Sequence, residues 1–140
     1  MEELLELRKS ITSGDYAKAL EIVDELEAMS KEDKLEKIYS YAIILLLHLI
    51  KQAAEQRTTK SWDVSIANSV ERINRINKRR KSGGYYAKKE NLIEIINDAI
   101  TPALRNASLE AFEGSLSEAE IRNKIDEEQI KAQALAMLET

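Results

Sequence analysis

Cysteine is absent from this chain of 140 residues, and histidine occurs once, at position 48. Without cysteine the chain has no disulfide, no thiolate nucleophile and no sulfur ligand for a metal. Position 45 is a leucine, so His48 is not part of the Glu-x-x-His pairs that hold di-iron centres in helical bundles. Zinc catalysis lacks the histidine and cysteine ligands that it needs. A Ser-His-Asp triad is disfavoured because the one histidine lies inside an apolar stretch. We therefore expect no metal and no cofactor, and the sequence contains no catalytic signature.

Proline and glycine are also scarce, with one and four residues, and no stretch alternates in the way a half-buried strand would. Leu, Ile, Ala, Glu and Lys are abundant, which favours helices. The sequence contains no G-x-x-x-x-G-K or G-x-G-x-x-G motif. Gly83-Gly84 offers too little backbone to hold a phosphate and suits the left-handed end of a helix.

Long hydrophobic runs are missing as well. No run approaches the roughly 20 apolar residues that a membrane-spanning helix needs. The first residues are acidic and lack the positive lead and apolar stretch of a secretory signal. Together with the lack of cysteine, these features predict a cytoplasmic protein that does not insert into a membrane.

The most apolar stretch that is present runs from Tyr41 to Ile50, where His48 is the only polar residue. Good helix formers flank it, and no glycine or proline interrupts them. We predict a central helix from Ser30 to about Arg57. Because its middle is apolar on every side, other helices are expected to surround it.

Local capping patterns divide the rest of the chain into further helices. Five predicted starts have a side chain that can accept a backbone N–H, namely Asp15, Ser30, Ser61, Ser117 and Asp126, and two further helices are predicted to begin near Glu2 and Lys88. Glycine or proline marks the breaks: Gly14, Gly83-Gly84, Pro102 and Gly114. Pro102 is expected to kink or split its helix. The predicted fold class is all-α, a single-domain helical bundle over residues 1–140 with six or seven helices and a long central apolar helix.

Charge is distributed unevenly along the chain, whose overall net charge is −4. Residues 1–40 carry a net charge of −5, residues 41–89 of +8, and residues 90–140 of −7. The densest basic segment lies on and after a helix whose opposite face is apolar. Its basic residues and the two tyrosines after them are candidate contacts for an anion or nucleic acid: Arg72, Arg75, Lys78, Arg79, Arg80, Lys81, Tyr85 and Tyr86.

This basic face of the helix around residues 72–81 has three interpretations. The first is a solvated face that pairs with the acidic ends of the chain, which requires no other molecule. The second is a contact with an acidic protein partner or with a second copy of the chain. Nucleic acid is the third and least favoured, because the chain is acidic overall and carries no recognised nucleic-acid-binding motif.

His48 and Trp62 are better explained by packing than by chemistry. We expect His48 in the core or at its boundary, bonded to a backbone carbonyl or a facing acid. A general base, a pH-sensitive contact and a ligand contact are the alternatives. Trp62 is expected to anchor the core, and a ligand platform is its alternative reading.

The middle of the chain resembles the bacterial, largely cyanobacterial, "domain of unknown function 29" family. In that family an apolar helix ending His-Leu-Leu-Lys precedes a polar segment, a Ser-Trp pair and a basic helix. The matching residues here are His48, Leu49, Ile50, Lys51, Ser61, Trp62, Arg72, Ile73 and Arg75. The resemblance covers roughly residues 32–108. The aromatic Trp-Gln-Tyr-Gln-Pro that often follows the lysine is replaced by Gln52-Ala53-Ala54-Glu55-Gln56, and the C-terminal part also differs.

The resemblance implies an all-helical fold and no catalytic residue, because the family has no established activity. The leading hypothesis is therefore a small non-enzymatic interaction module that binds a protein partner or itself, for example as a homodimer. The alternative is a nucleic-acid-binding protein that uses the basic face of the helix around residues 72–81.

Overall fold

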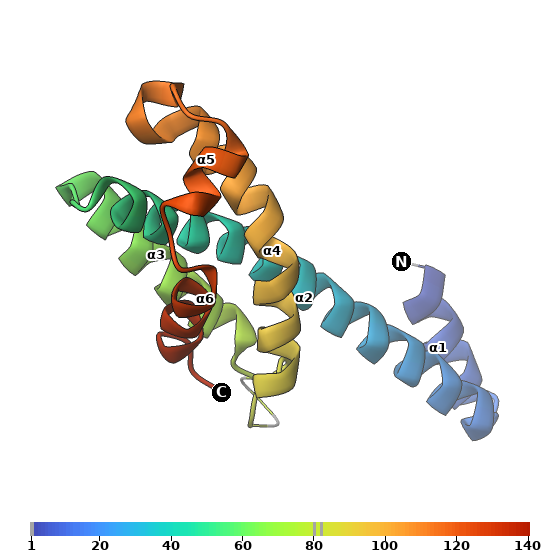
Figure 1. The fold of residues 1–140 in the computed structure, drawn as a ribbon. Coiled ribbons are helices and arrows are strands. Elements are labelled where there is room, and N and C mark those ends of the chain that lie inside the picture. Colours follow the sequence, from blue (N-terminus) through green and yellow to red (C-terminus); the bar gives the residue numbers. More distant parts are fainter. Residues whose placement is uncertain (1, 80, 82) are drawn as a thin grey trace. The chain divides into compact units, whose positions relative to one another are not determined.

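The computed structural model describes residues 2–79, 81 and 83–140. Over these residues the chain forms helices and a 3-10 turn but no strand, in this order: α1 (Glu2–Thr12), α2 (Tyr16–Glu55), α3 (Lys60–Asn77), α4 (Lys89–Glu110), η1 (Ala111–Gly114), α5 (Glu118–Asn123) and α6 (Glu127–Ala136) (Figure 1). The predicted all-α fold class is confirmed. The chain divides into two compact units, Met1–Lys34 and Leu35–Thr140. The single domain over residues 1–140 stays a prediction.

The first unit is a helical hairpin made of α1 and the beginning of α2. Gly14 adopts a φ of +80° in the turn. Asp15 then begins α2 by accepting the backbone N–H of Lys18 at 3.2 Å, as predicted. Ala19 and Ile22 are buried, together with Ser10 of α1. The apolar spacing of this part of α2 predicts a buried face that includes Tyr16, Leu20 and Val23, but these three side chains are exposed.

Helix α2 runs without interruption for 40 residues and passes through Ser30. The predicted start of a separate central helix at Ser30 is therefore wrong. Ser30 and Asp33 form a capping pattern, but no glycine or proline precedes them to end the earlier helix. A serine inside a run of helix formers costs only a few tenths of a kcal/mol relative to alanine, which is too little to break a helix.

The core of the second unit is built on the second half of α2. Leu45, Leu46, Leu49 and Ile50 are almost fully buried, whereas Ile44 is 39% exposed. The other helices supply the remaining buried side chains: Ile73 from α3, Leu92, Ile96, Ile100 and Leu104 from α4, Ile121 from α5, and Ile130 and Ala134 from α6. The predicted apolar spine is thus confirmed, with one side left partly open.

Helix α3 begins and ends at residues other than those predicted. Its N-cap is Thr59, whose hydroxyl oxygen accepts the backbone N–H of Trp62 at 3.1 Å, so Ser61 is not the cap. The helix ends at Asn77. Gly83 and Gly84 have φ values of +73° and +74°, but they lie in the following loop and not at the helix end.

Helix α4 is continuous through Pro102, so the predicted split does not occur. Its buried face carries small residues four apart: Ala99, Ala103 and Ala107. Small side chains let neighbouring elements approach closely, and α4 packs against η1, α5 and α6. Pro102 is only partly buried and lies off this face.

The predicted continuation of this helix to Gly114 is also wrong, because α4 ends at Glu110. Phe112, Glu113 and Gly114 have φ values of +52°, +56° and +77°. Such a left-handed run is unfavourable for residues with a Cβ. It closes the helix and reverses the chain into α5.

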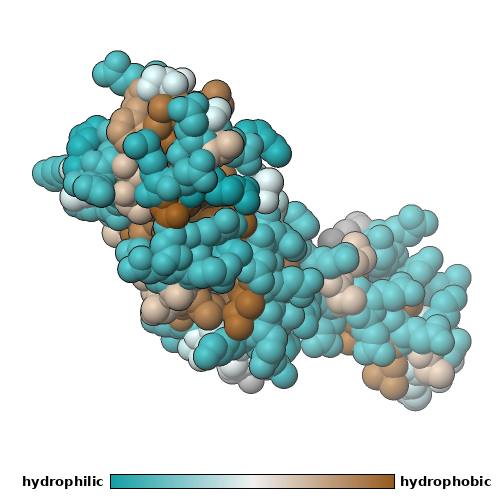
Figure 2. Space-filling model, in the orientation of Figure 1, coloured by the Kyte–Doolittle hydropathy of each residue, from teal (hydrophilic) through white to brown (hydrophobic). Residues whose placement is uncertain are grey.

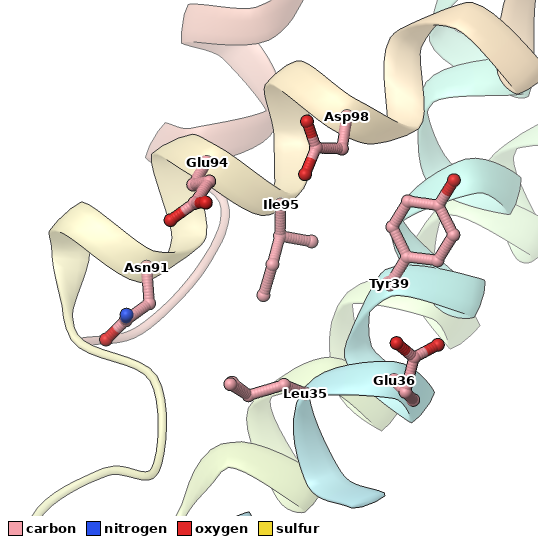
Figure 3. A pocket seen from close by; sticks show the side chains of 7 residues that line it. All are labelled: Leu35, Glu36, Tyr39, Asn91, Glu94, Ile95 and Asp98. Atoms are coloured by element: carbon pink, nitrogen blue, oxygen red, sulfur yellow. The ribbon is translucent and has the colours of Figure 1, made fainter. Parts of the chain in front are cut away.

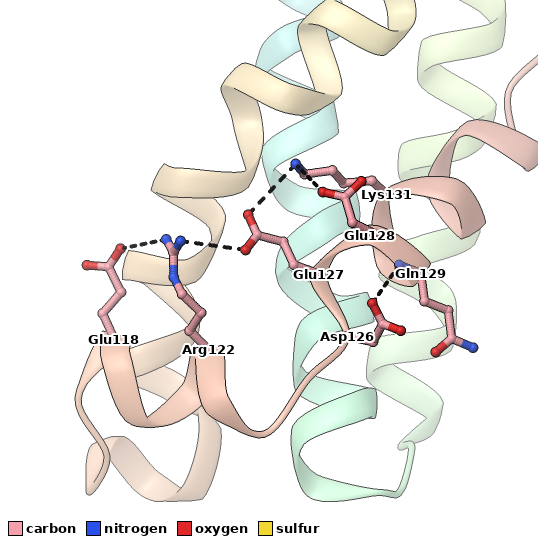
Figure 4. A network of polar contacts seen from close by, with 7 residues as sticks. All are labelled: Glu118, Arg122, Asp126, Glu127, Glu128, Gln129 and Lys131. Atoms are coloured by element: carbon pink, nitrogen blue, oxygen red, sulfur yellow. Dashed lines mark hydrogen bonds and ion pairs between the residues drawn. The ribbon is translucent and has the colours of Figure 1, made fainter.

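The C-terminal helices begin at the predicted caps. Ser117 and Glu120 form a reciprocal capping box, and Asp126 accepts the backbone N–H of Gln129 at 3.2 Å. Arg122 of α5 reaches Glu127 of α6 at 3.5 Å, and Lys131 lies 3.8 Å from the same carboxylate (Figure 4). Because these ion pairs are near the surface, they orient α5 and α6 more than they stabilise them.

None of the helices in the described ranges contains a stretch apolar enough and long enough to cross a membrane.

Candidate functional site

The most distinctive polar region of the second unit is the loop that joins α3 to α4. We call residues 78, 79, 81 and 83–88 the basic loop. Asn77, which is completely buried, holds its far end: the side-chain oxygen accepts the Ala87 N–H at 2.6 Å, and the side-chain NH₂ donates to the Ala87 carbonyl at 3.0 Å. The backbone carbonyl of Asn77 also accepts the Tyr86 N–H at 2.9 Å. The two ends of the loop are therefore held together by one side chain and its backbone.

Inside the basic loop the chain folds back on itself. Lys78 and Tyr85 form an isolated antiparallel bridge, and the backbone N–H of Arg79 donates to the Gly84 carbonyl at 3.0 Å. The guanidinium carbon of Arg79 lies 5.5 Å from the centroid of the Tyr86 ring. The left-handed Gly84 permits the reversal, since a residue with a Cβ would be strained at that φ. The two sides of the loop thus pair as a small hairpin.

The structure divides the candidate basic residues into two groups. Arg72 and Arg75 remain on α3 and are exposed, as predicted. Lys78, Arg79 and Lys81 lie beyond the end of the helix, so the prediction that they continue the same helical face is wrong. The helix ends here because the backbone carbonyl and the side chain of Asn77 form hydrogen bonds with Tyr86 and Ala87 of the loop. Arg80 lies outside the described residues.

A groove of about 540 Å³ lies at the basic loop. Its lining includes the charged residues Arg79, Lys88, Lys89 and Glu90, and the ring of Tyr85. Lys88 and Lys89 were not among the candidate residues. Their closeness to the tyrosines in sequence was the available signal, but only the closure of the loop brings them beside Arg79.

Arg72 and Arg75 line a second groove, of about 520 Å³, between α2 and α3. Tyr41 and Ile44 of α2 form its apolar side. Arg75 approaches Glu71 of its own helix at 4.0 Å, and both side chains are exposed. In the part of the chain that the structure describes, Arg72, Lys78 and Lys81 form no ion pair with the acidic ends, although such pairing was the first interpretation.

Two of the residues that carry the family resemblance, Lys51 and Trp62, are in contact. The ammonium of Lys51 is 3.0 Å from Oε1 of Glu110 and 4.6 Å from the centroid of the Trp62 ring. The guanidinium of Arg57 lies 4.8 Å from the same ring. Trp62 is buried, and its expected role as a core anchor stays a prediction. Ser61 is exposed and caps nothing.

His48 lies one turn before Lys51 on α2 and is partly buried, as expected for a boundary histidine. Its Nδ1 atom is buried and has no hydrogen-bond partner, so the expected bond to a carbonyl or acid is not made at this nitrogen. Burial lowers the pKa of His48, the Lys51 ammonium lowers this pKa further, and Glu110 opposes both effects. Burial and Lys51 therefore favour the neutral form of the ring over the charged form.

Among the described residues, no three side chains of histidine, cysteine, aspartate or glutamate are grouped so that they could hold a metal ion. The two basic grooves place guanidinium and ammonium groups beside tyrosines, an arrangement that can recognise negative charge and flat rings.

Comparison with known proteins gives one match. No curated protein and no solved structure matches this chain. A family profile described as "Domain of unknown function DUF29" matches residues 15–133. This range contains the central helix, the Lys51–Trp62 contact and the basic loop, and it is most of the chain. The chain therefore belongs to the Domain of unknown function DUF29 family.

Proposed function

We propose that this chain is a non-enzymatic interaction module that self-associates through its N-terminal hairpin. The observation that carries the proposal is a group of large apolar side chains on the first unit, each between 42% and 66% exposed. We call this group the hairpin stripe: Leu4, Leu5, Ile11, Tyr16, Leu20, Val23 and Met29. Apolar side chains also reach the surface of this unit in Figure 2.

The spacing of the hairpin stripe supports a helical partner. Tyr16, Leu20 and Val23 follow one another at four and three residues, so they share one face of α2. Ala19 and Ile22, which are buried, face the inside of the hairpin. A two-helix hairpin can bury only one face of each helix against the other. A second pair of helices would cover the remaining face, as in a four-helix bundle.

A second copy of the chain supplies such a pair without any other molecule. Identical stripes related by a two-fold axis are complementary to themselves. Covering the half-exposed side chains of two copies would contribute on the order of 15 kcal/mol. Association costs roughly 4–15 kcal/mol, so the net gain is at most about 11 kcal/mol and we expect dissociation constants of about 10 nM or weaker.

Acidic residues border the stripe, and they set the salt dependence of this contact. Glu21, Asp24 and Glu27 lie between and after its α2 members. Two copies would bring like charges together, which opposes association at low ionic strength. Self-association through the hairpin should therefore strengthen as salt is added.

Light scattering of the full-length chain at high micromolar concentration tests this proposal. At about 1 M NaCl, where the Debye length is roughly 3 Å, we expect a dimer for the native sequence and a monomer for Leu20→Glu with Val23→Glu. A matched control places the same two changes at exposed apolar sites elsewhere, Val64→Glu with Leu109→Glu, and should remain dimeric. A native chain that stays monomeric under these conditions refutes the proposal.

Polyanion binding is a second candidate function, supported by the ordered basic loop. The loop keeps Arg79 stacked on Tyr86 and places Lys88 and Lys89 beside Tyr85 around one groove. Cations that neutralise phosphates, next to rings that stack on bases, are the features of single-strand binders.

Fluorescence anisotropy with a labelled single-stranded oligonucleotide tests this second function. We expect binding at low salt that weakens steeply as salt increases. Lys88→Glu with Lys89→Glu should abolish it, and Arg72→Glu with Arg75→Glu should leave it less affected, because the latter pair lies on α3. No binding at low salt, or equal losses in both variants, argues against the loop as a nucleic-acid site.

A further inference from the structure

A third groove of the second unit is acidic, and it lies between α2 and α4 (Figure 3). Its volume is about 520 Å³. We call it the acidic groove and define it by its lining: Leu35, Glu36 and Tyr39 of α2 with Asn91, Glu94, Ile95 and Asp98 of α4. In Figure 3, Ile95 points from α4 toward Leu35. The groove thus combines an apolar floor with three carboxylates.

These carboxylates have no cation beside them. Within the described ranges, Glu36, Glu94 and Asp98 take part in no ion pair. Glu94 and Asp98 are four residues apart on one helix, where like charges repel each other. Pro102 has no N–H, so the carbonyl oxygen of Asp98 also lacks its usual helical donor. The groove therefore presents acceptors and negative charge without internal compensation.

We propose that the acidic groove receives the basic loop of a second copy of the chain. The loop is exposed at Lys78, Lys81 and Lys88, and these lysines form no ion pair in the described part of the molecule. The charges of loop and groove are opposite and of similar number. Lysine side chains also suit the apolar floor of the groove. Their aliphatic carbons can cover apolar surface while the ammonium group lies near the carboxylates at the edge.

The positions of loop and groove make this contact reciprocal. They adjoin at the beginning of α4, where Asn91 lines the groove and its side-chain oxygen accepts the backbone N–H of Lys88 at 3.0 Å. No residue of the loop lines the groove of its own copy. A two-fold axis near Asn91 would place each loop in the opposite groove, which gives two identical contacts.

This inference rests on the proposed self-association and names a second surface for it. The two contacts depend on salt in opposite ways. The loop–groove contact joins opposite charges and should be lost at high salt, whereas the hairpin contact should strengthen. If one of the two contacts does not form, the other can therefore still be measured at the salt concentration that favours it.

Charge reversal with mixing tests the loop–groove contact in the full-length chain. The groove-reversed variant is Glu94→Lys with Asp98→Lys, and the loop-reversed variant is Lys81→Glu with Lys88→Glu. Sedimentation velocity at about 10 mM salt, where charges act over about 30 Å, should show the native chain as a dimer. Each variant alone should lose at least about tenfold in affinity, because like charges then meet. An equimolar mixture should form the dimer again.

A control variant separates a specific contact from general attraction. Lys60→Glu with Arg105→Glu carries the same net charge as the loop-reversed variant but leaves the basic loop intact. Mixed with the groove-reversed variant, it should not restore the dimer. Restoration by this control, persistence of dimers in either reversed variant alone, or a monomeric native chain at low salt each overturns the proposal.

Discussion

The side-chain amide of Asn77 is paired on both sides with the backbone of Ala87, ten residues further along the chain. Both partners are completely buried. A single asparagine therefore ends α3, closes the basic loop and aligns the start of α4.

Replacing this asparagine should destabilise the protein and loosen the loop. Asn77→Leu would leave the N–H and C=O of Ala87 buried without partners, at a cost of about 2–4 kcal/mol. Urea unfolding measures the loss, and amide exchange at Ala87 should accelerate. Asn77→Asp retains an acceptor for the Ala87 N–H but buries a carboxylate against the Ala87 carbonyl oxygen, so it should also destabilise the protein. An unchanged exchange rate at Ala87 in Asn77→Leu would contradict this account of the loop.

The Lys51–Glu110 pair should show strong coupling in a double-mutant cycle. The Lys51 side chain is 7% exposed and that of Glu110 is 47% exposed. Glu110→Gln removes the charge that compensates a buried ammonium, and we expect a loss of about 1–3 kcal/mol, because the exposed carboxylate is partly screened. Lys51→Met keeps most of the packing on Trp62. The double variant should be less destabilised than the sum of the single changes, as chemical denaturation can measure. Additive losses would show that the pair contributes nothing.

His48 should make the fold less stable in mild acid. Its pKa in the folded state is lowered, first by burial and then by Lys51, with Glu110 acting in the opposite direction. The unfolded chain therefore takes up the proton more readily. Stability is complete above the unfolded pKa of about 6.5 and falls as the pH drops from there to the lowered folded pKa.

Denaturant unfolding of the native chain and of His48→Leu on both sides of this range checks the sign. The variant should lose the histidine-dependent part of the pH dependence. Because Nδ1 has no hydrogen-bond partner, the leucine costs no such bond. A native chain that is as stable in mild acid as at neutral pH would contradict the prediction.

Because the backbone after α4 is left-handed, substitutions at two neighbouring positions should change the stability of the fold in opposite directions. Glu113 has a φ of +56°, so Glu113→Gly should stabilise the fold by about 1 kcal/mol. Gly114→Ala should destabilise it by at least about 1 kcal/mol, since the new Cβ would meet the Leu109 carbonyl oxygen at 3.0 Å and the φ is +77°. Thermal unfolding of the two variants decides this, and shifts of the same sign would refute the left-handed geometry.

Local patterns were sufficient for the helical class and for several boundaries. Asp15, Ser117 and Asp126 begin helices where the sequence predicts them, because a cap and its N–H donor lie only three residues apart. The apolar stretch around Leu45 is buried for an equally simple reason, since no face of it can be exposed without cost. The candidate residues Arg72 and Arg75 are exposed on α3, as the sequence predicts.

Tertiary structure decided the rest. Ser30 has a cap pattern but no chain break before it, so the preference of the neighbouring residues for helix prevailed. Lys51 and Glu110 are 59 residues apart, and no periodicity joins them. The basic loop owes its form to one buried asparagine, and the acidic groove arises only where α2 and α4 pack side by side.

What the sequence determined by itself is a set of helices with apolar faces, since hydrogen bonds and periodicity act over three or four residues. Which charges meet, which face stays uncovered and where grooves form depend on contacts between residues far apart in the chain. The free energy of those contacts depends on how whole helices pack, so no single segment of the sequence determines it.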